Sequence, residues 1–155
     1  MTPIKEHPTL GVLNSPQSVA AAYLLAWQYK DYKRMVKTMQ LTYQSKIFRQ
    51  NWQNMEFEEL QNFLTSLVVD KSHETQMTIV ARNFNQYTIK SFQIVGELKP
   101  SKGVNPRVQR PVIADIDFGS GAKRYKLVCN CETKPFHASP SGIWGVYPTA
   151  KLKAA

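Results

Sequence analysis

The chain contains 155 residues, a length that suits one domain with a substantial hydrophobic core. Hydrophobic residues make up 43% of the sequence and aromatic residues 11%, which excludes a disordered or low-complexity chain. The net charge of +9 favours an acidic partner such as nucleic acid, anionic lipid headgroups or an acidic protein, although such a charge also simply promotes solubility.

Neither a membrane span nor a secretory signal is visible in the sequence. No apolar run approaches the roughly 18 residues that cross a bilayer. The first eight residues lack the apolar core of a signal peptide. We therefore expect a cytoplasmic protein, or alternatively a domain excised from a longer exported protein.

The chain opens with helical signals. Residues 1–14 contain two prolines and a glycine without periodicity, so we expect an extended lead-in before a single domain over residues 15–155. Ser15-Pro16 is a favourable helix start, with serine as the N-cap and proline in the first turn. The following residues, 19–29, are apolar on nearly every side, which is typical of a helix buried on more than one face.

A second helix is predicted to begin at Tyr32. Its apolar residues recur at helical spacing, at Tyr32, Met35, Val36, Met39 and Tyr43. The opposite side carries a stripe of basic residues, Lys30, Lys33, Arg34 and Lys37. A third helix is predicted over residues 54–69, and the stretch 70–84 is ambiguous because its apolar residues Met77, Ile79 and Ala81 alternate as in a strand.

The second half of the chain predicts an antiparallel sheet. Strands are expected over residues 87–98, 112–118, 124–132 and 143–147, with a hairpin at Gly119-Ser-Gly121. Residues 112, 114, 116 and 118 form a continuous apolar face, so Asp115 and Asp117 should point outward beside Arg124 and Lys126. A long basic loop, 99–110, joins the first two strands.

Helices followed by an antiparallel sheet make an α+β architecture. The order resembles the nuclear transport factor 2-like superfamily, which has a cystatin-like cone, and the resemblance implies N-terminal helices packed in the concave face of a curved sheet. The resemblance lies in residues 18–35, an apolar helix, an Asp-Tyr corner and a second helix, and in the final segment 143–147. Within that superfamily it is most similar to non-catalytic bacterial members, such as the N-terminal domain of some penicillin-binding proteins.

The resemblance implies a conical pocket. Enzymatic members of the superfamily include ketosteroid isomerases, dehydratases and cyclases, whereas binding members dimerise or hold partner proteins through the outer sheet face. Candidate pocket residues are Tyr23, Trp27, Asp31, Tyr125 and Trp144. For the aromatic residues among them we favour a role as core that fills the cone, and for Asp31 we favour a cap on the second helix.

Catalytic and metal-binding signals are weak, so we predict no catalytic residue, no metal site and no cofactor. His7, His73 and His137 lie in polar or loop segments, which leaves no acid–histidine pair for a dehydratase. Cys129 and Cys131 stand two apart on a predicted strand, where they suit small buried hydrophobic roles rather than a disulfide or a zinc site.

We therefore expect a binding or assembly module that uses its sheet face and its basic surface. That surface combines the helix stripe with the loop residues Lys99, Lys102, Arg107 and Arg110. The expected partners are a second copy in a homodimer or an acidic protein. One alternative is a pocket protein that binds a small ligand or acts like an isomerase or dehydratase. The other is a nucleic-acid accessory protein, which is disfavoured because the basic loop contains no aromatic residue for base stacking.

Overall fold

The computed structural model of the protein describes residues 14–48, 58–59, 62–63, 65–66, 73–99, 102–105, 108–132 and 143–155. The bounded helices precede every strand and are α3 (Pro16–Gln28), α4 (Tyr32–Lys37), α5 (Leu41–Phe48) and α7 (Glu74–Phe84). The strands are β1 (Ser91–Glu97), β2 (Gln109–Asp117), β3 (Ala122–Glu132), β4 (Ile143–Val146) and β5 (Lys153–Ala154). The predicted α+β class is confirmed.

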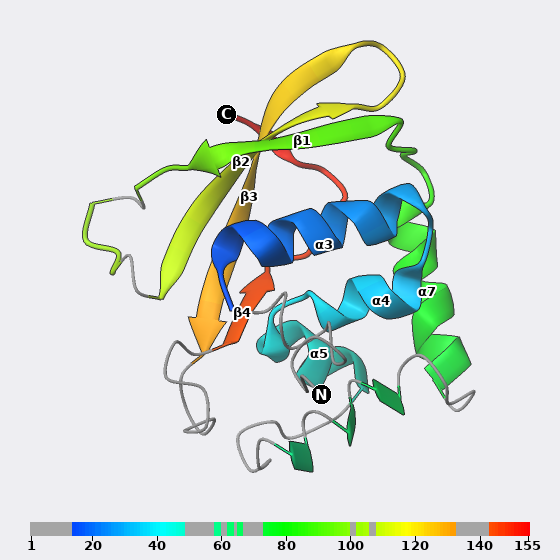
Figure 1. Ribbon diagram of the computed structural model, residues 1–155. Coiled ribbons are helices and arrows are strands. Elements are labelled where there is room, and N and C mark those ends of the chain that lie inside the picture. The colour runs from blue at the N-terminus through cyan, green and yellow to red at the C-terminus, as the bar shows by residue number, and fades with distance from the viewer. Residues whose placement is uncertain are drawn as a thin grey trace, which may run out of the picture.

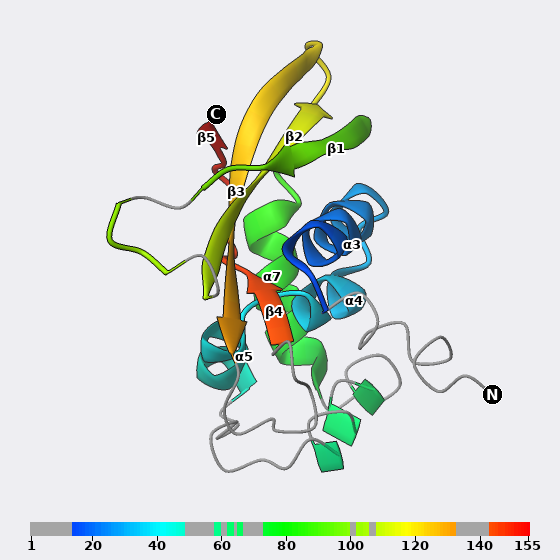
Figure 2. The same ribbon diagram turned by 60° about the vertical axis from the view of Figure 1, so that its left-hand side comes forward.

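A curled antiparallel sheet forms one layer of the molecule (Figure 1). Its strands lie in the order β1-β2-β3-β4, and β5 pairs with β3 on the same edge as β4. Helices α3, α4 and α7 lie on one side of this sheet (Figure 2), and α3 contacts each of β1, β2, β3 and β4. The N-terminal helices therefore occupy the concave face, as the sequence predicts. No helix of the described residues is long and apolar enough to cross a bilayer.

The core is centred on Trp27 of α3. Its side chain retains 1% of its exposure, and its ring packs edge-on against Phe84 with a centroid separation of 5.0 Å. The indole Nε1–H donates to the backbone oxygens of Phe84, at 3.1 Å, and of Tyr87, at 3.0 Å. This one side chain therefore ties α3 both to the end of α7 and to the segment that leads into β1.

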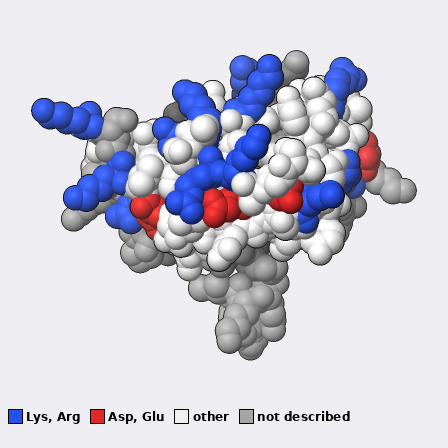
Figure 3. Space-filling model, turned by 90° about the horizontal axis from the view of Figure 1, so that it is seen from above, with Lys and Arg blue, Asp and Glu red and all other residues white. Residues whose placement is uncertain are grey.

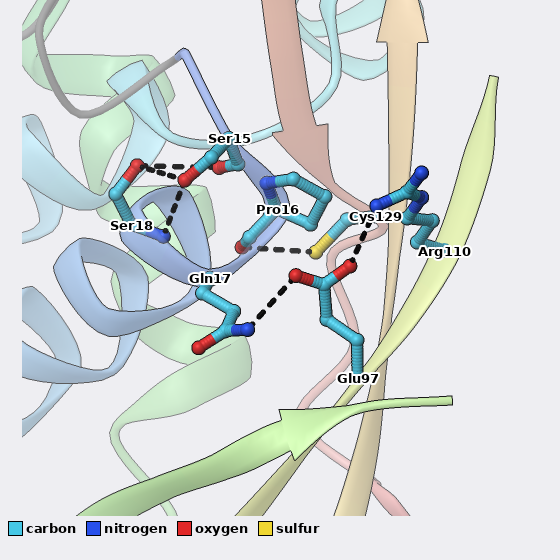
Figure 4. Close-up of polar contacts among 7 residues, drawn as sticks. All are labelled: Ser15, Pro16, Gln17, Ser18, Glu97, Arg110 and Cys129. Atoms are coloured by element: carbon cyan, nitrogen blue, oxygen red, sulfur yellow. Dashed lines mark hydrogen bonds and ion pairs between the residues drawn. The ribbon is translucent and has the colours of Figure 1, made fainter. Parts of the chain in front are cut away.

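The N-terminus of α3 is anchored in the way the sequence predicts. The Ser15 hydroxyl accepts a hydrogen bond from the backbone N–H of Ser18 at 3.2 Å, and Pro16 follows in the first turn (Figure 4). Beyond the cap, the Gln17 amide donates to the Glu97 carboxylate at 2.9 Å. The start of the helix is therefore fixed to the end of β1.

The single helix predicted from Tyr32 to Tyr43 is wrong, because α4 ends at Lys37 and α5 begins at Leu41. Between them the chain pairs with β4: Val146 N–H donates to the Thr38 oxygen at 2.7 Å, and Gln40 N–H donates to the Val146 oxygen at 3.0 Å. These bonds to β4 take the place of helical hydrogen bonds at residues 38–40. The apolar residues keep their helical spacing in the sequence although the helix is interrupted there.

The ambiguous stretch 70–84 contains helix α7, and the strand-like alternation at its centre is misleading. Met77, Val80 and Phe84 are buried at helical spacing, whereas Ile79 is 45% exposed. The described residues of the predicted third helix, between 58 and 66, are helical. Strand β1 begins at Ser91 rather than at residue 87, where the Tyr87 carbonyl already accepts from Trp27.

Gly145 of β4 lies directly against the break between α4 and α5. A Cβ atom on Gly145 would lie 2.5 Å from the Cα atom of Gln40 and 2.7 Å from its backbone nitrogen. Because these are backbone atoms held by the pairing with Val146, they cannot rotate away. Only glycine fits at this position without a shift of the chain.

We expect Gly145→Ala to lower the free energy of unfolding by about 2 kcal/mol, since overpacking at a closed site forces the backbone to move. Gly96→Ala is the matched control, because a Cβ atom there meets nothing within 4 Å. Urea unfolding of both variants measures the difference. Equal stability of the two variants would show that Gln40 does not cross Gly145.

Candidate interaction surface

The aromatic pocket candidates lie inside the core. Tyr23 has no exposure, Trp27 has 1% and Trp144 has 6%. Tyr23 and Trp27 contact each other and Phe84 edge-on, with centroid separations between 5.0 and 6.1 Å. Tyr125 is partly buried and packs against Phe118 at 5.5 Å. These rings fill the concave side of the sheet with protein atoms.

Asp31, the acidic pocket candidate, caps α4. Its carboxylate accepts from the backbone N–H of Arg34 at 3.3 Å and pairs with the Arg34 guanidinium at 2.6 Å. Both contacts are local to one turn of helix. The capping role that the sequence left open is therefore the one the structure shows.

Glu97 is the carboxylate that sequence reasoning missed. A β-bulge between Ile94 and Gly96 shifts the register, so Glu97 pairs with Val112 and shares its concave face. Its carboxylate accepts from Gln17 and pairs with Arg110 at 3.2 Å (Figure 4). A glycine inside a strand is the sequence signal that could have indicated this bulge.

An isomerase-like site requires a carboxylate that is free to move a proton inside an apolar cavity. Glu97 is instead held by an arginine and an amide beside the start of α3. Near it, the Cys129 thiol donates to the Pro16 carbonyl at 3.7 Å, and burial followed by the Glu97 charge raises the pKa of this thiol. Such a neutral thiol is a poor nucleophile.

Both cysteines are buried and neither forms a disulfide, which confirms their predicted role as small buried residues. His73 packs between the rings of Phe48 and Phe63, with centroid separations of 5.4 and 5.9 Å. Within the described ranges, histidine, cysteine and acidic side chains nowhere gather in a group of three that could bind a metal ion.

The basic stripe on the helices is divided by internal contacts. Lys33 pairs with Glu74 at 2.8 Å, and Arg34 pairs with Asp31. Lys30 lies between the helices in a left-handed conformation, with φ of 56°, and its ammonium donates to the Asn85 side chain at 2.9 Å. Burial, and next the neighbouring Arg34, lower the pKa of Lys37.

The basic residues of the loop between β1 and β2 also do not form one continuous surface. Lys99 and Lys102 are exposed, whereas Arg110 faces the concave side and pairs with Glu97. Arg107 lies outside the described residues. Other basic side chains spread over the end of the molecule that carries β1, the β2–β3 hairpin and the C-terminus, with a line of acidic side chains between them (Figure 3).

The outer face of the sheet carries an apolar row across four neighbouring chain segments. The row is defined by direct pairings between Leu98, Pro111, Val128 and Tyr147. Each residue alternates with a concave-facing neighbour such as Val112, Leu127 or Val146, so all four side chains point outward. Pro111 at its centre is buried, while Leu98 and Tyr147 at its ends are 50% and 54% exposed.

Two lysines stand directly opposite each other in the next row of the same face. Lys126 of β3 pairs with Lys153 of β5, and in the described part of the chain no acidic side chain forms an ion pair with either. Like charges at directly paired positions destabilise a sheet. The apolar row is therefore bordered by a concentrated positive charge.

The remaining rows of the outer face are polar and internally satisfied. Asp115 pairs with Arg124 at 2.9 Å, which confirms its predicted outward position, and this guanidinium holds the pKa of the Asp115 carboxyl below its usual range. Asp117 accepts from the backbone N–H groups of Gly119 and Gly121 and so closes the hairpin. The apolar row and the lysine pair thus stand out from surroundings whose charges are already compensated.

Comparisons of the chain with protein-family models, with curated proteins and with solved structures find no match. The function of this surface is therefore inferred from its own residues.

We expect Lys153→Glu to raise the free energy of unfolding by about 0.5 kcal/mol at low salt, because it replaces repulsion across the β3–β5 pair with attraction. Lys151→Glu is the matched control, since it makes the same charge change on an exposed residue outside the pair. Thermal unfolding at low and high salt measures both variants. If both variants gain the same stability, or if the gain of Lys153→Glu does not depend on salt, the result would argue against repulsion between Lys126 and Lys153.

Proposed function

We propose that the protein is a non-catalytic binding module that docks an acidic protein on the outer face of its sheet. The observation that carries this proposal is the apolar row of Leu98, Pro111, Val128 and Tyr147 beside the opposed Lys126 and Lys153. Apolar contact supplies the binding free energy, and the lysines select a partner that brings carboxylates to that position.

The packing of the concave side supports this choice of face. Tyr23, Trp27 and Trp144 are buried there, and Glu97 is engaged by Arg110 and Gln17. A pocket enzyme would need an open cavity at these residues and an unengaged acid. We therefore rank the hypothesis of a pocket enzyme below that of a docking module.

Charge favours an acidic protein over a second copy of the chain. Docking of this face onto itself would place two lysine pairs, and two proteins of net charge +9, in one interface. Nucleic acid is a weaker candidate, since single-strand binders stack several bases on aromatic platforms and Tyr147 is the one aromatic residue of the row.

We further propose that the chain is a nuclear transport factor 2-like protein. Support comes from α3 lying across a curled antiparallel sheet and from the helices preceding the strands. A cytoplasmic location is part of this proposal, and the burial of Cys129 and Cys131 as thiols is compatible with it.

Site-specific photo-crosslinking in living cells tests the docking face. A photoreactive phenylalanine analogue at Tyr147 should capture a protein rich in Asp and Glu, and the adduct should diminish when Lys126 and Lys153 are both changed to Glu. The matched control carries the analogue at Ile79 of α7, which is 45% exposed and lies on a different element.

Three results would contradict the proposal. They are an adduct of twice the chain mass, which indicates a homodimer, an adduct with nucleic acid, and identical capture from Tyr147 and Ile79. Loss of the acidic adduct in the lysine variant, with the control unchanged, would support it.

A further inference from the structure

A cleft of about 310 Å³ lies at the border of the aromatic core, between α5, the end of α7 and the segment 148–151. One wall is formed by Tyr43 of α5 together with Phe84 and Tyr87 at the end of α7, and the opposite wall is the segment 148–151. Such a volume lies at the lower end of the range for small-molecule sites.

The aromatic wall is preorganised. Phe84 is held edge-on by Tyr23 at 6.0 Å and by Trp27 at 5.0 Å, and Tyr87 packs against Phe118 at 6.2 Å. Since these rings are fixed by the core, a planar ligand would bind them without ordering them first, which reduces the entropic cost of binding.

The opposite wall is fixed by a local hydrogen-bonded turn. The Thr149 hydroxyl accepts from the backbone N–H of Lys151 at 3.1 Å and lies 3.3 Å from its carbonyl oxygen. Behind this wall the Tyr23 hydroxyl is fully buried, faces the backbone of Thr149, and has no hydrogen bond of good geometry among the described residues. A buried hydroxyl without a hydrogen-bond partner costs free energy, so a polar group placed next to the Tyr23 hydroxyl would stabilise this part of the core.

The charge of the cleft is positive. Among its described lining residues, Lys151 is the one formally charged side chain, and it is exposed at the rim. Asn83 and Gln86 add amide groups on the side of α7. An anionic group on a ligand would therefore find an ammonium and neutral donors, and no carboxylate to repel it.

We propose that this cleft binds a small aromatic carboxylate, with its ring against Tyr43 and Tyr87 and its carboxylate on Lys151. This site is separate from the docking face. Tyr147 belongs to that face but does not line the cleft, which is lined instead by the four residues that follow Tyr147.

The test is a titration followed by backbone amide NMR, with indole-3-acetate as the probe and indole-3-acetamide as its neutral isostere. We expect indole-3-acetate to shift the amide signals of residues 83–87 and 148–151 with a dissociation constant on the order of 1 mM, as suits a fragment of this size. Lys151→Gln should weaken this binding about fivefold. Lys153→Gln, with the same charge change outside the cleft, should leave it unchanged.

Gln86→Trp keeps the test decisive, because Gln86 is exposed and a larger side chain there fills the cleft without disturbing the core. This variant should fold and lose the shifts. The proposal is overturned if about 10 mM probe causes no saturable shift, if the shifts lie elsewhere, if the amide isostere binds equally well, or if Gln86→Trp binds as the parent does.

Discussion

The indole of Trp27 is the contact on which the rest of the structure depends. Its single N–H group is shared between the carbonyls of Phe84 and Tyr87, and its ring meets Phe84 and Phe118. Loss of this residue would open a large cavity and remove the indole donor from both carbonyls, of which, among the described residues, only that of Phe84 keeps a second donor, the Tyr87 N–H at 3.3 Å. The position of α3 beside the end of α7 and the start of β1 follows from this anchorage.

Filling the concave side bears on the proposed function. Because tyrosine and tryptophan rings close that side, the proposal places the contacts with a partner on the opposite face of the same strands. There the rows differ in character: the charges of one row are compensated by the pair of Asp115 and Arg124, whereas the next contains the opposed Lys126 and Lys153. Retaining repulsion at one place in an otherwise balanced face is consistent with a surface that awaits a negatively charged partner.

Sequence patterns predicted the elements that local physics controls. The Ser15 cap, the Asp31 cap, the glycine hairpin and the outward position of Asp115 all follow from residue type or period. The wrong predictions have a different origin. The break after Lys37 depends on backbone pairing with Val146, and the concave position of Glu97 depends on the bulge in β1. The apolar row could not be predicted either, because it depends on the register between the strands, and the bulge before Glu97 decides which face Leu98 occupies.

The most direct test of the proposed docking face is a methyl NMR titration with a peptide of alternating Glu and Leu, compared with one of alternating Lys and Leu. The acidic peptide should shift the methyl signals of Leu98 and Val128, which belong to the apolar row. It should leave the inward-facing Val112 and Leu127 unchanged. Equal binding of the basic peptide, or shifts confined to the inner methyl groups, would contradict the account.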